Sequence, residues 1–299
     1  MADLPRITAA HLLDTYLQFP DSIRRDTGAA SFTISLSIIN YYLGDNWLQT
    51  HLNPLLNKPG FMRLKLIDQA ATSFIQAFKT VDMGELLFNL QNIEGFDALV
   101  ERMKTEAQVE SGLAELDFGR MLFINNHKFR FVRPSGVRGN DYDFEINFDK
   151  WTLCADVKCK LDEKQLSKGI IKNELSNSRT QLPPDKPGIF FIKAPQHWTR
   201  KFLFEQILVE AAKEFLCTTE RVVSIKYYIA PYEVRNGFLQ QGHEFKEIDN
   251  PRHRFEGLRR CELFSYRPPL GALDALPPKW RRLYDFPNGF LKHDHDFTI

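Results

Sequence analysis

The spacing of the apolar residues changes from a helical to a strand period after about residue 125, and that change limits the folds open to this chain. Over roughly the first third, apolar side chains recur at the spacing of one helix face. The helices expected there cover Ile7 to Phe19, Ser31 to Gly44, Met62 to Phe78 and Leu86 to Met103. After Asn125 apolar residues alternate with polar ones, which predicts strands. A helical subdomain over residues 1–105 is therefore expected to precede an α/β region.

The second part of the chain alternates strand and helix patterns in a definite order. The expected elements are a helix over Val109–Asn125, strands over Lys128–Pro134, Asp141–Phe148 and Trp151–Lys160, a largely helical crossover over Leu161–Leu182, a strand over Gly188–Pro195, a helix over Lys201–Leu216 and a strand over Arg221–Val234. Asp149 and Lys150 form the expected hairpin turn between the second and third strands. This order predicts an α/β sandwich around a mixed central sheet over residues 106–234. Residues 235–299 are expected to form an irregular extension that packs on this core.

The composition narrows the range of partners and compartments. With 39 Lys and Arg against 38 Asp and Glu, the net charge is only +1, so any basic surface for nucleic acid must be local. The four cysteines have no metal-finger spacing. The first residues carry acids and prolines where a secretory signal needs a basic start, and the sequence contains no long uncharged apolar run. These features predict a cytoplasmic protein without a membrane segment.

Charged residues occupy alternate positions on the two strands of the expected hairpin. Each strand has a charged face and an apolar face. On the first strand these are Asp141, Asp143 and Glu145 against Tyr142, Phe144 and Ile146, and on the second Asp156, Lys158 and Lys160 against Ala155, Val157 and Cys159. Because hairpin strands pair side by side, the acids of the first strand are expected to lie beside Asp156 and Lys158.

Carboxylates that converge on one spot repel each other unless a divalent cation neutralises them. Their hard oxygen ligands favour Mg²⁺ or Mn²⁺. A lysine nearby can orient or deprotonate a water, or stabilise the charge that develops on a phosphate. The pattern is therefore typical of metal-assisted hydrolysis of a phosphodiester.

Four stretches between Val109 and Pro195 resemble the PD-(D/E)xK nuclease superfamily, also called restriction-endonuclease-like. They are VESGLAELDFGRML, GNDYDFEI, LCADVKCK and NSRTQLPPDKPGIFFIKAP. The resemblance implies an αβββαβ core in which an acid of the second strand and an acid of the third bind metal. It also implies that the lysine two residues after the second acid assists the attacking water, and that a glutamate of the first helix completes the site.

Carried over position by position, the resemblance makes Asp143 and Asp156 metal ligands and Lys158 the catalytic lysine. It makes Glu115 the helix acid and adds the Val157 main-chain carbonyl as a ligand, with Mg²⁺ or Mn²⁺ as the cofactor. Asp141 is the alternative to Asp143, since Tyr142 rather than a proline precedes Asp143. Glu110, on the same expected helix, is the alternative to Glu115. The proposed contacts to substrate are Lys160, Arg179 and Gln181.

Two functions follow from these observations. The first is a metal-dependent nuclease that hydrolyses DNA or RNA. The second is an inactive nuclease-fold protein, which binds a protein partner through its helical N-terminal subdomain and its aromatic C-terminal segment. The locally basic segment Pro251–Arg260 suits a phosphate backbone and equally suits a solvated loop.

Overall fold

The structure, a computed structural model, describes residues 4–52, 69–105, 109–159, 166–195, 198, 202–229, 232–235, 238–241, 244–258, 263–264, 279–287 and 290. They divide into a helical unit, Met1–Leu116 with Leu276–Ile299, and a sheet unit, Asp117–Ala275. The division falls inside one helix, and so differs from the boundary expected between residues 105 and 106. The described residues 279–287 and 290 belong to the helical unit, whereas the sequence predicted that residues 235–299 pack on the α/β core.

The helical unit contains more helices than its apolar spacing predicted. They are α1 (Ala9–Leu17), α2 (Asp21–Arg24), α3 (Thr27–Leu43), α4 (Asp45–Leu52), α5 (Gln69–Leu90), α6 (Phe96–Thr105) and the first part of α7 (Val109–Ile124). The helix α5 continues through residues 79–85, where a break was expected. In this stretch α5 packs closely against α3 at Gly84. A Cβ atom added at Gly84 would lie only 2.8 Å from the Ser35 Cβ atom, so a glycine is needed for the two backbones to approach this closely. Residues 62–68 of the expected third helix lie outside the described residues.

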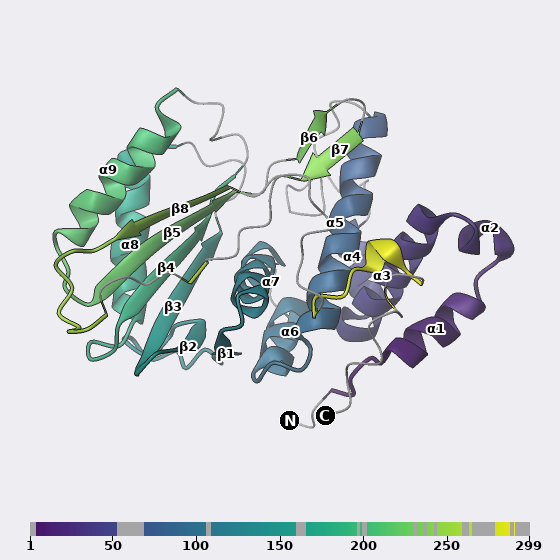
Figure 1. Cartoon of the computed structure of the whole chain (residues 1–299), viewed down its shortest axis with the longest axis horizontal. Helices are drawn as coiled ribbons and strands as arrows, with labels where there is room; N and C mark the ends of the chain where they lie inside the picture. Colours follow the sequence, from purple (N-terminus) through teal and green to yellow (C-terminus); the bar gives the residue numbers. More distant parts are fainter. Residues whose placement is uncertain are drawn as a thin grey trace. The chain divides into compact units, whose positions relative to one another are not determined.

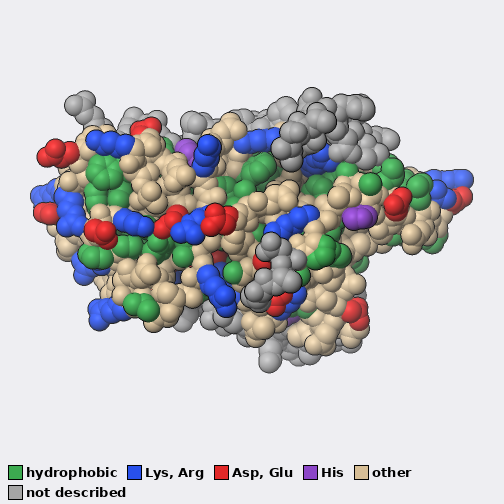
Figure 2. Space-filling view, turned by 90° about the horizontal axis from the view of Figure 1, so that it is seen from below, with side chains coloured by type: hydrophobic (Ala, Val, Ile, Leu, Met, Phe, Trp, Pro, Cys, Tyr) green, Lys and Arg blue, Asp and Glu red, His purple; other side chains and the backbone are tan. Residues whose placement is uncertain are grey.

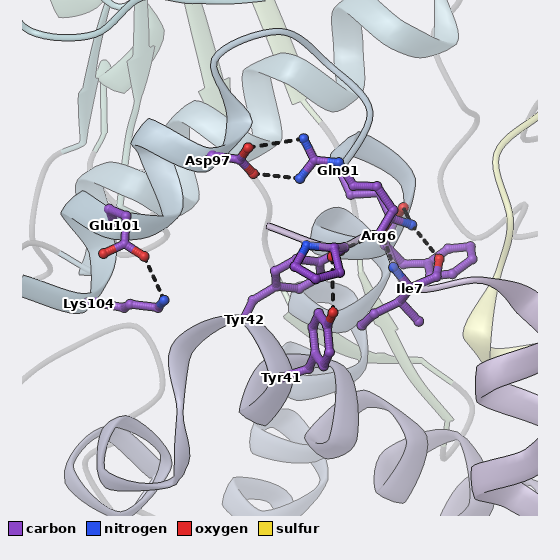
Figure 3. A network of polar contacts seen from close by, with 10 residues as sticks. Arg6, Ile7, Tyr41, Tyr42, Gln91, Asp97, Glu101 and Lys104 are labelled. Atoms are coloured by element: carbon purple, nitrogen blue, oxygen red, sulfur yellow. Dashed lines mark hydrogen bonds and ion pairs between the residues drawn. The ribbon is translucent and has the colours of Figure 1, made fainter. Parts of the chain in front are cut away.

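A network of polar contacts ties the start of the chain to the helices (Figure 3). The Arg6 guanidinium binds the Asp97 carboxylate through two hydrogen bonds of 2.5 and 3.2 Å. The Gln91 side chain accepts from the Ile7 N–H at 2.7 Å, donates to the Ile7 carbonyl at 3.0 Å and accepts from the Tyr42 hydroxyl. Burial raises the pKa of Tyr42 to about 12, so this hydroxyl keeps its proton and donates.

A segment near the C-terminus is held by α3 and α5 within the same unit. The turn η3 (Leu283–Asp285) begins where the Leu283 N–H donates to the Glu85 carboxylate at 2.8 Å. The Trp280 indole donates to the same carboxylate at 3.2 Å, and the Ser31 hydroxyl donates to the Leu283 carbonyl at 2.7 Å. These hydrogen bonds pair buried polar groups of segments that lie far apart in the sequence.

The sheet unit is built on a six-stranded mixed sheet (Figure 1). Its strands are β1 (Lys128–Phe131), β2 (Phe144–Phe148), β3 (Trp151–Cys159), β4 (Gly188–Lys193), β5 (Val222–Ile229) and β8 (Glu244–Asp249). The order is β1-β2-β3-β4-β5-β8, in which β3, β4 and β5 run parallel and the other neighbours pair antiparallel. The strand β8 lies in the region expected to be irregular, and that expectation was wrong there. The strand expected over Arg221–Val234 is divided into β5 and β6 (Tyr232–Arg235), and β6 pairs with β7 (Phe238–Gln241).

The expected hairpin between the second and third strands is confirmed. Phe144 pairs with Ala155 and Phe148 with Trp151. Asp149 occupies the turn with a φ of 51°, a left-handed conformation that aspartate tolerates better than most residues.

Helices cover both faces of this sheet. The helices α8 (Lys168–Gln181) and α9 (Phe204–Leu216) lie on one face, which we call the α8 face. On the other face, Phe118 of α7 packs against Phe144 and Phe191, with ring centroids 4.9 and 4.7 Å apart. Tyr142, expected beside Phe144, instead joins the core of the α8 face, because β2 and its alternation begin only at Phe144.

The charges on the face of the molecule seen in Figure 2 are mixed, with Lys and Arg interspersed among Asp and Glu. This distribution agrees with the small net charge of the chain. Among the described residues, no helix combines the length and the apolar character needed to cross a bilayer.

Candidate functional site

The two predicted acids and the predicted lysine of the hairpin meet on the α8 face of the sheet unit. Asp156 lies in the middle of β3, where the strand is buried on both faces, and only 1% of the residue is exposed. Asp143 directly precedes β2, and its Oδ2 atom accepts a hydrogen bond of 2.7 Å from the Val157 N–H. This bond places the Asp143 carboxylate beside the segment that carries Asp156 and Lys158.

Lys158 links the strand to the end of α8. Its Nζ atom donates to Asp156 Oδ1 at 2.9 Å and to Gln181 Oε1 at 2.8 Å. Gln181 is the last residue of α8, so the end of that helix determines where the ammonium group lies. The sequence predicts Gln181 as a substrate contact, and in the structure its side chain accepts a hydrogen bond from Lys158.

The second carboxylate oxygen of Asp156 is not engaged by Lys158. Asp156 Oδ2 is buried and has no hydrogen-bond partner among the residues that the structure describes. An unpaired buried carboxylate oxygen is costly, and here burial and the neighbouring Asp143 carboxylate raise the pKa of Asp156 to about 7. The Lys158 ammonium and the Ser178 hydroxyl offset only part of that rise. The position therefore suits a cation or a proton.

Lys158 carries a positive charge in this site. Burial lowers its pKa, but the Asp156 and Asp143 carboxylates outweigh burial and leave the pKa above its ordinary value. A lysine that keeps its proton at neutral pH cannot act as a general base in this state. Holding a water and stabilising negative charge both fit this environment.

The Val157 main chain points to the same edge as Asp143. The Val157 N–H faces the end of β2, where the ladder between β2 and β3 has stopped. Because the N–H and C=O of one strand residue point the same way, the Val157 carbonyl is directed to that edge as well. It is therefore available as a third oxygen ligand beside the carboxylates.

Two residues of α8 that the sequence analysis did not name also face the site. The Ser178 hydroxyl lowers the pKa of Asp156, and the Glu174 carboxylate raises the pKa of Lys158. Together with Gln181 they occupy positions i, i+4 and i+7 of one helix, which share a face. The spacing of these three polar residues is visible in the sequence. The sequence does not show that this face of α8 lies against β3.

The structure separates Asp143 from its alternative. The Asp141 carboxylate accepts from the main-chain N–H groups of Ser135 and Gly136 at 2.9 and 3.1 Å. It therefore organises the loop before β2. Only Asp143 contacts β3 at Val157.

Glu115 is buried in the helical unit, where its carboxylate forms an ion pair with Arg102. This pair gives Glu115 a structural role, and its assignment as a metal ligand stays a prediction, as does that of Glu110. Lys160 lies outside the described residues. Arg179 lies two residues before Gln181 and donates to the Thr218 carbonyl at 3.3 Å.

Glu145 shares the strand face predicted for Asp143 but has other partners. Its carboxylate accepts from the Tyr142 hydroxyl at 2.6 Å, from Arg130 at 2.8 Å and from Lys186 at 3.0 Å. Although burial raises the pKa of Glu145, these three donors lower it to about 2. A carboxylate so fully engaged is a structural anion, so Asp143 and Asp156 remain as the acids of the hairpin region assigned to the candidate site.

The described residues contain no group of three or more His, Cys, Asp or Glu side chains placed to hold a metal. Two carboxylates and one carbonyl are nevertheless a sufficient protein contribution for Mg²⁺, which usually keeps several of its waters. The chain matches no protein-family model, no curated protein and no solved structure.

Proposed function

We propose that this protein is a metal-dependent nuclease that hydrolyses the phosphodiester bonds of DNA or RNA. The observation that carries the proposal is the meeting of Asp143, Asp156 and Lys158 around a buried carboxylate oxygen that has no hydrogen-bond partner in the described part of the chain. The elements α7, β1, β2, β3, α8 and β4 follow one another in the order that the restriction-endonuclease-like core requires, which also supports the proposal.

The residues of the site fit a divalent cation. Asp143, Asp156 and the Val157 carbonyl would hold Mg²⁺ or Mn²⁺ through hard oxygen atoms. When bound, such a cation neutralises the two carboxylates, activates a water and polarises a phosphoryl oxygen.

The remaining steps belong to side chains of this chain. Lys158, held as a cation, donates a hydrogen bond to the attacking water or to a phosphate oxygen, and so stabilises the charge that grows there. Gln181 fixes the direction of Lys158 by accepting one of its three N–H bonds. Asp156 accepts a hydrogen bond from Lys158 and compensates part of its positive charge.

Cleavage of labelled DNA and RNA in Mg²⁺ or Mn²⁺ tests this proposal with three variants. We expect Asp156→Asn and Lys158→Met to lower the cleavage rate at least about a thousandfold, since each removes charge from the reacting centre. Asp141→Asn is the matched control, because it makes the same chemical change in the adjacent loop and should leave the rate within about fivefold. Undiminished cleavage in EDTA, or by Asp156→Asn, would contradict the proposal.

Absence of cleavage has a defined meaning when metal binding is measured as well. Calorimetric titration of Mn²⁺ into the wild type and Asp156→Asn reports the cation independently of the reaction. If the wild type neither cleaves nor binds Mn²⁺, the nuclease proposal fails and the inactive nuclease-fold alternative replaces it.

A further inference from the structure

Four arginines of the sheet unit line a separate pocket of about 550 Å³. They are Arg179 at the end of α8, Arg221 just before β5, and Arg252 and Arg254 after β8. Glu220 is the one acid among the lining residues. The pocket thus gathers a local excess of positive charge in a chain whose net charge is only +1.

None of these four guanidinium groups forms an ion pair with a carboxylate in the described part of the chain. Arg179 donates to the Thr218 carbonyl at 3.3 Å, and Arg221 and Arg254 donate to the Arg179 and Pro184 carbonyls. Each of these bonds holds the side chain but leaves its charge uncompensated. A guanidinium has five N–H donors, so each group keeps donors for a ligand.

The cations also repel one another. The pKa of Arg221 is lowered by burial and further by the positive charges of Arg179 and Arg254. Crowding of this kind is unfavourable in the free protein and is relieved when an anion binds between the cations. Arg252 and Arg254 are exposed, so the pocket is accessible from solvent.

We infer that this arginine pocket binds phosphate groups of a polynucleotide backbone. Planar guanidinium groups match phosphate oxygens in geometry and charge. The inference deepens the proposed function and rests on it for the choice of a polynucleotide over other phosphates. It unites Arg179, the predicted substrate contact, with part of the basic segment Pro251–Arg260.

The helix α8 connects the pocket to the candidate active site. Arg179 and Gln181 are two residues apart, about 3 Å along the helix and about 200° around it. One helix end therefore presents Gln181 to Lys158 and Arg179 to the pocket. If the arginines hold the phosphates of a polynucleotide, its backbone is fixed relative to the carboxylates of Asp143 and Asp156, because the pocket and the candidate site belong to the same unit.

The test is binding of fluorescein-labelled 20-nucleotide DNA and RNA to the full chain in EDTA, measured by anisotropy over a range of salt concentrations. The exposed pair is replaced in Arg252→Gln/Arg254→Gln, and Arg221→Gln is examined separately. Arg25→Gln is the control, because its side chain is 84% exposed in the helical unit. It removes one positive charge, as Arg221→Gln does. Thermal unfolding confirms that each variant is folded.

We expect the double variant to bind at least about tenfold more weakly. The slope of the logarithm of its binding constant against the logarithm of the salt concentration should fall in magnitude by about 1 for each phosphate that the arginines no longer neutralise. Arg25→Gln should change neither quantity. Equal binding by the double variant and the control would overturn the inference, even if Asp156-dependent cleavage is found. Arginine-dependent binding without any cleavage would support the pocket and remove only the nuclease proposal.

Competition separates the sources of phosphate. Unlabelled oligonucleotide should displace the probe at far lower concentration than inorganic phosphate or ATP, since it presents several phosphates in series. Displacement by ATP at concentrations equal to those of the oligonucleotide would instead identify a nucleotide site and contradict the inference.

Discussion

Lys158 of β3 and Gln181 at the end of α8 are joined by a hydrogen bond of 2.8 Å between Nζ and Oε1. Lys158 makes its other bond to Asp156 on its own strand. The lysine is thus held from two elements whose residues lie more than twenty positions apart in the sequence. A bond from a helix end is what fixes the direction of this long side chain.

Replacing Gln181 should reduce cleavage without unfolding the protein. We expect Gln181→Ala to lower the rate about 10- to 100-fold, because Lys158 loses the acceptor that orients it. Gln181→Glu keeps an acceptor and should retain more activity than Gln181→Ala. Thr180→Val is the control, since the Thr180 hydroxyl bonds only to the Asn177 carbonyl of its own helix. Equal rates for Gln181→Ala and the wild type would refute the positioning role.

The buried Asp156 should make stability fall as the pH rises. Its pKa is about 7 in the folded protein and 3.8 as the ordinary value. Between these pH values Asp156 keeps its proton in the folded state and loses it in the unfolded state. The stabilisation that comes from protonated Asp156 is therefore complete below pH 3.8 and is lost by about pH 7. The loss is at most about 4 kcal/mol of unfolding free energy.

Comparing the unfolding free energies of Asp156→Asn and the wild type at pH 5 and pH 8 measures this effect. The variant should gain stability relative to the wild type at pH 8, because it lacks the buried charge. Added Mn²⁺ should raise the melting temperature of the wild type more at pH 8 than at pH 5, since protons compete with the cation. If the difference in unfolding free energy between Asp156→Asn and the wild type does not change with pH, Asp156 does not have a raised pKa in the folded protein.

Glu145 should give the opposite pH dependence at lower pH. Its pKa is lowered from 4.5 to about 2 by Tyr142, Arg130 and Lys186, which outweigh burial. The stabilisation is therefore complete above pH 4.5 and lost as the pH falls toward 2, by up to about 3 kcal/mol. Denaturant unfolding of Glu145→Gln against the wild type between pH 2 and 6 should show the gap closing as the pH falls. A constant gap would exclude this ionic contribution.

The aromatic core on the α7 face of the sheet should be sensitive to truncation. Phe118 is fully buried and packs against Phe144 and Phe191. Phe118→Ala should cost about 3–5 kcal/mol of unfolding free energy, because it leaves a cavity. Phe202→Ala removes the same side chain from a position that is 90% exposed, and should change stability by less than about 0.5 kcal/mol. Chemical denaturation of both variants measures the difference.

The sequence determined much of the local structure. The change of apolar spacing predicted helices followed by strands, and the alternation on either side of Asp149 predicted the hairpin of β2 and β3. The same alternation predicted that Asp143 lies near Asp156 and Lys158. These features depend on neighbours in the chain, so a periodic pattern is enough to specify them.

Other features depend on pairing between segments that are distant in the sequence. The strand β8 was missed because its edge position beside β5 comes from the sheet rather than from its own pattern. The end of the chain joins the helical unit because Glu85 offers acceptors to Trp280 and Leu283. Neither partner could be recognised from its local sequence.

The candidate site shows the same division most clearly. The sequence by itself supplied Asp143, Asp156 and Lys158 and the reason to examine them together. Only the tertiary structure decided that Asp141 holds a loop, that Gln181 orients Lys158 and that Arg179 lies with three other arginines. The physical reason is that burial and charge interactions act through space, so the protonation and the role of each group are set by side chains from other elements.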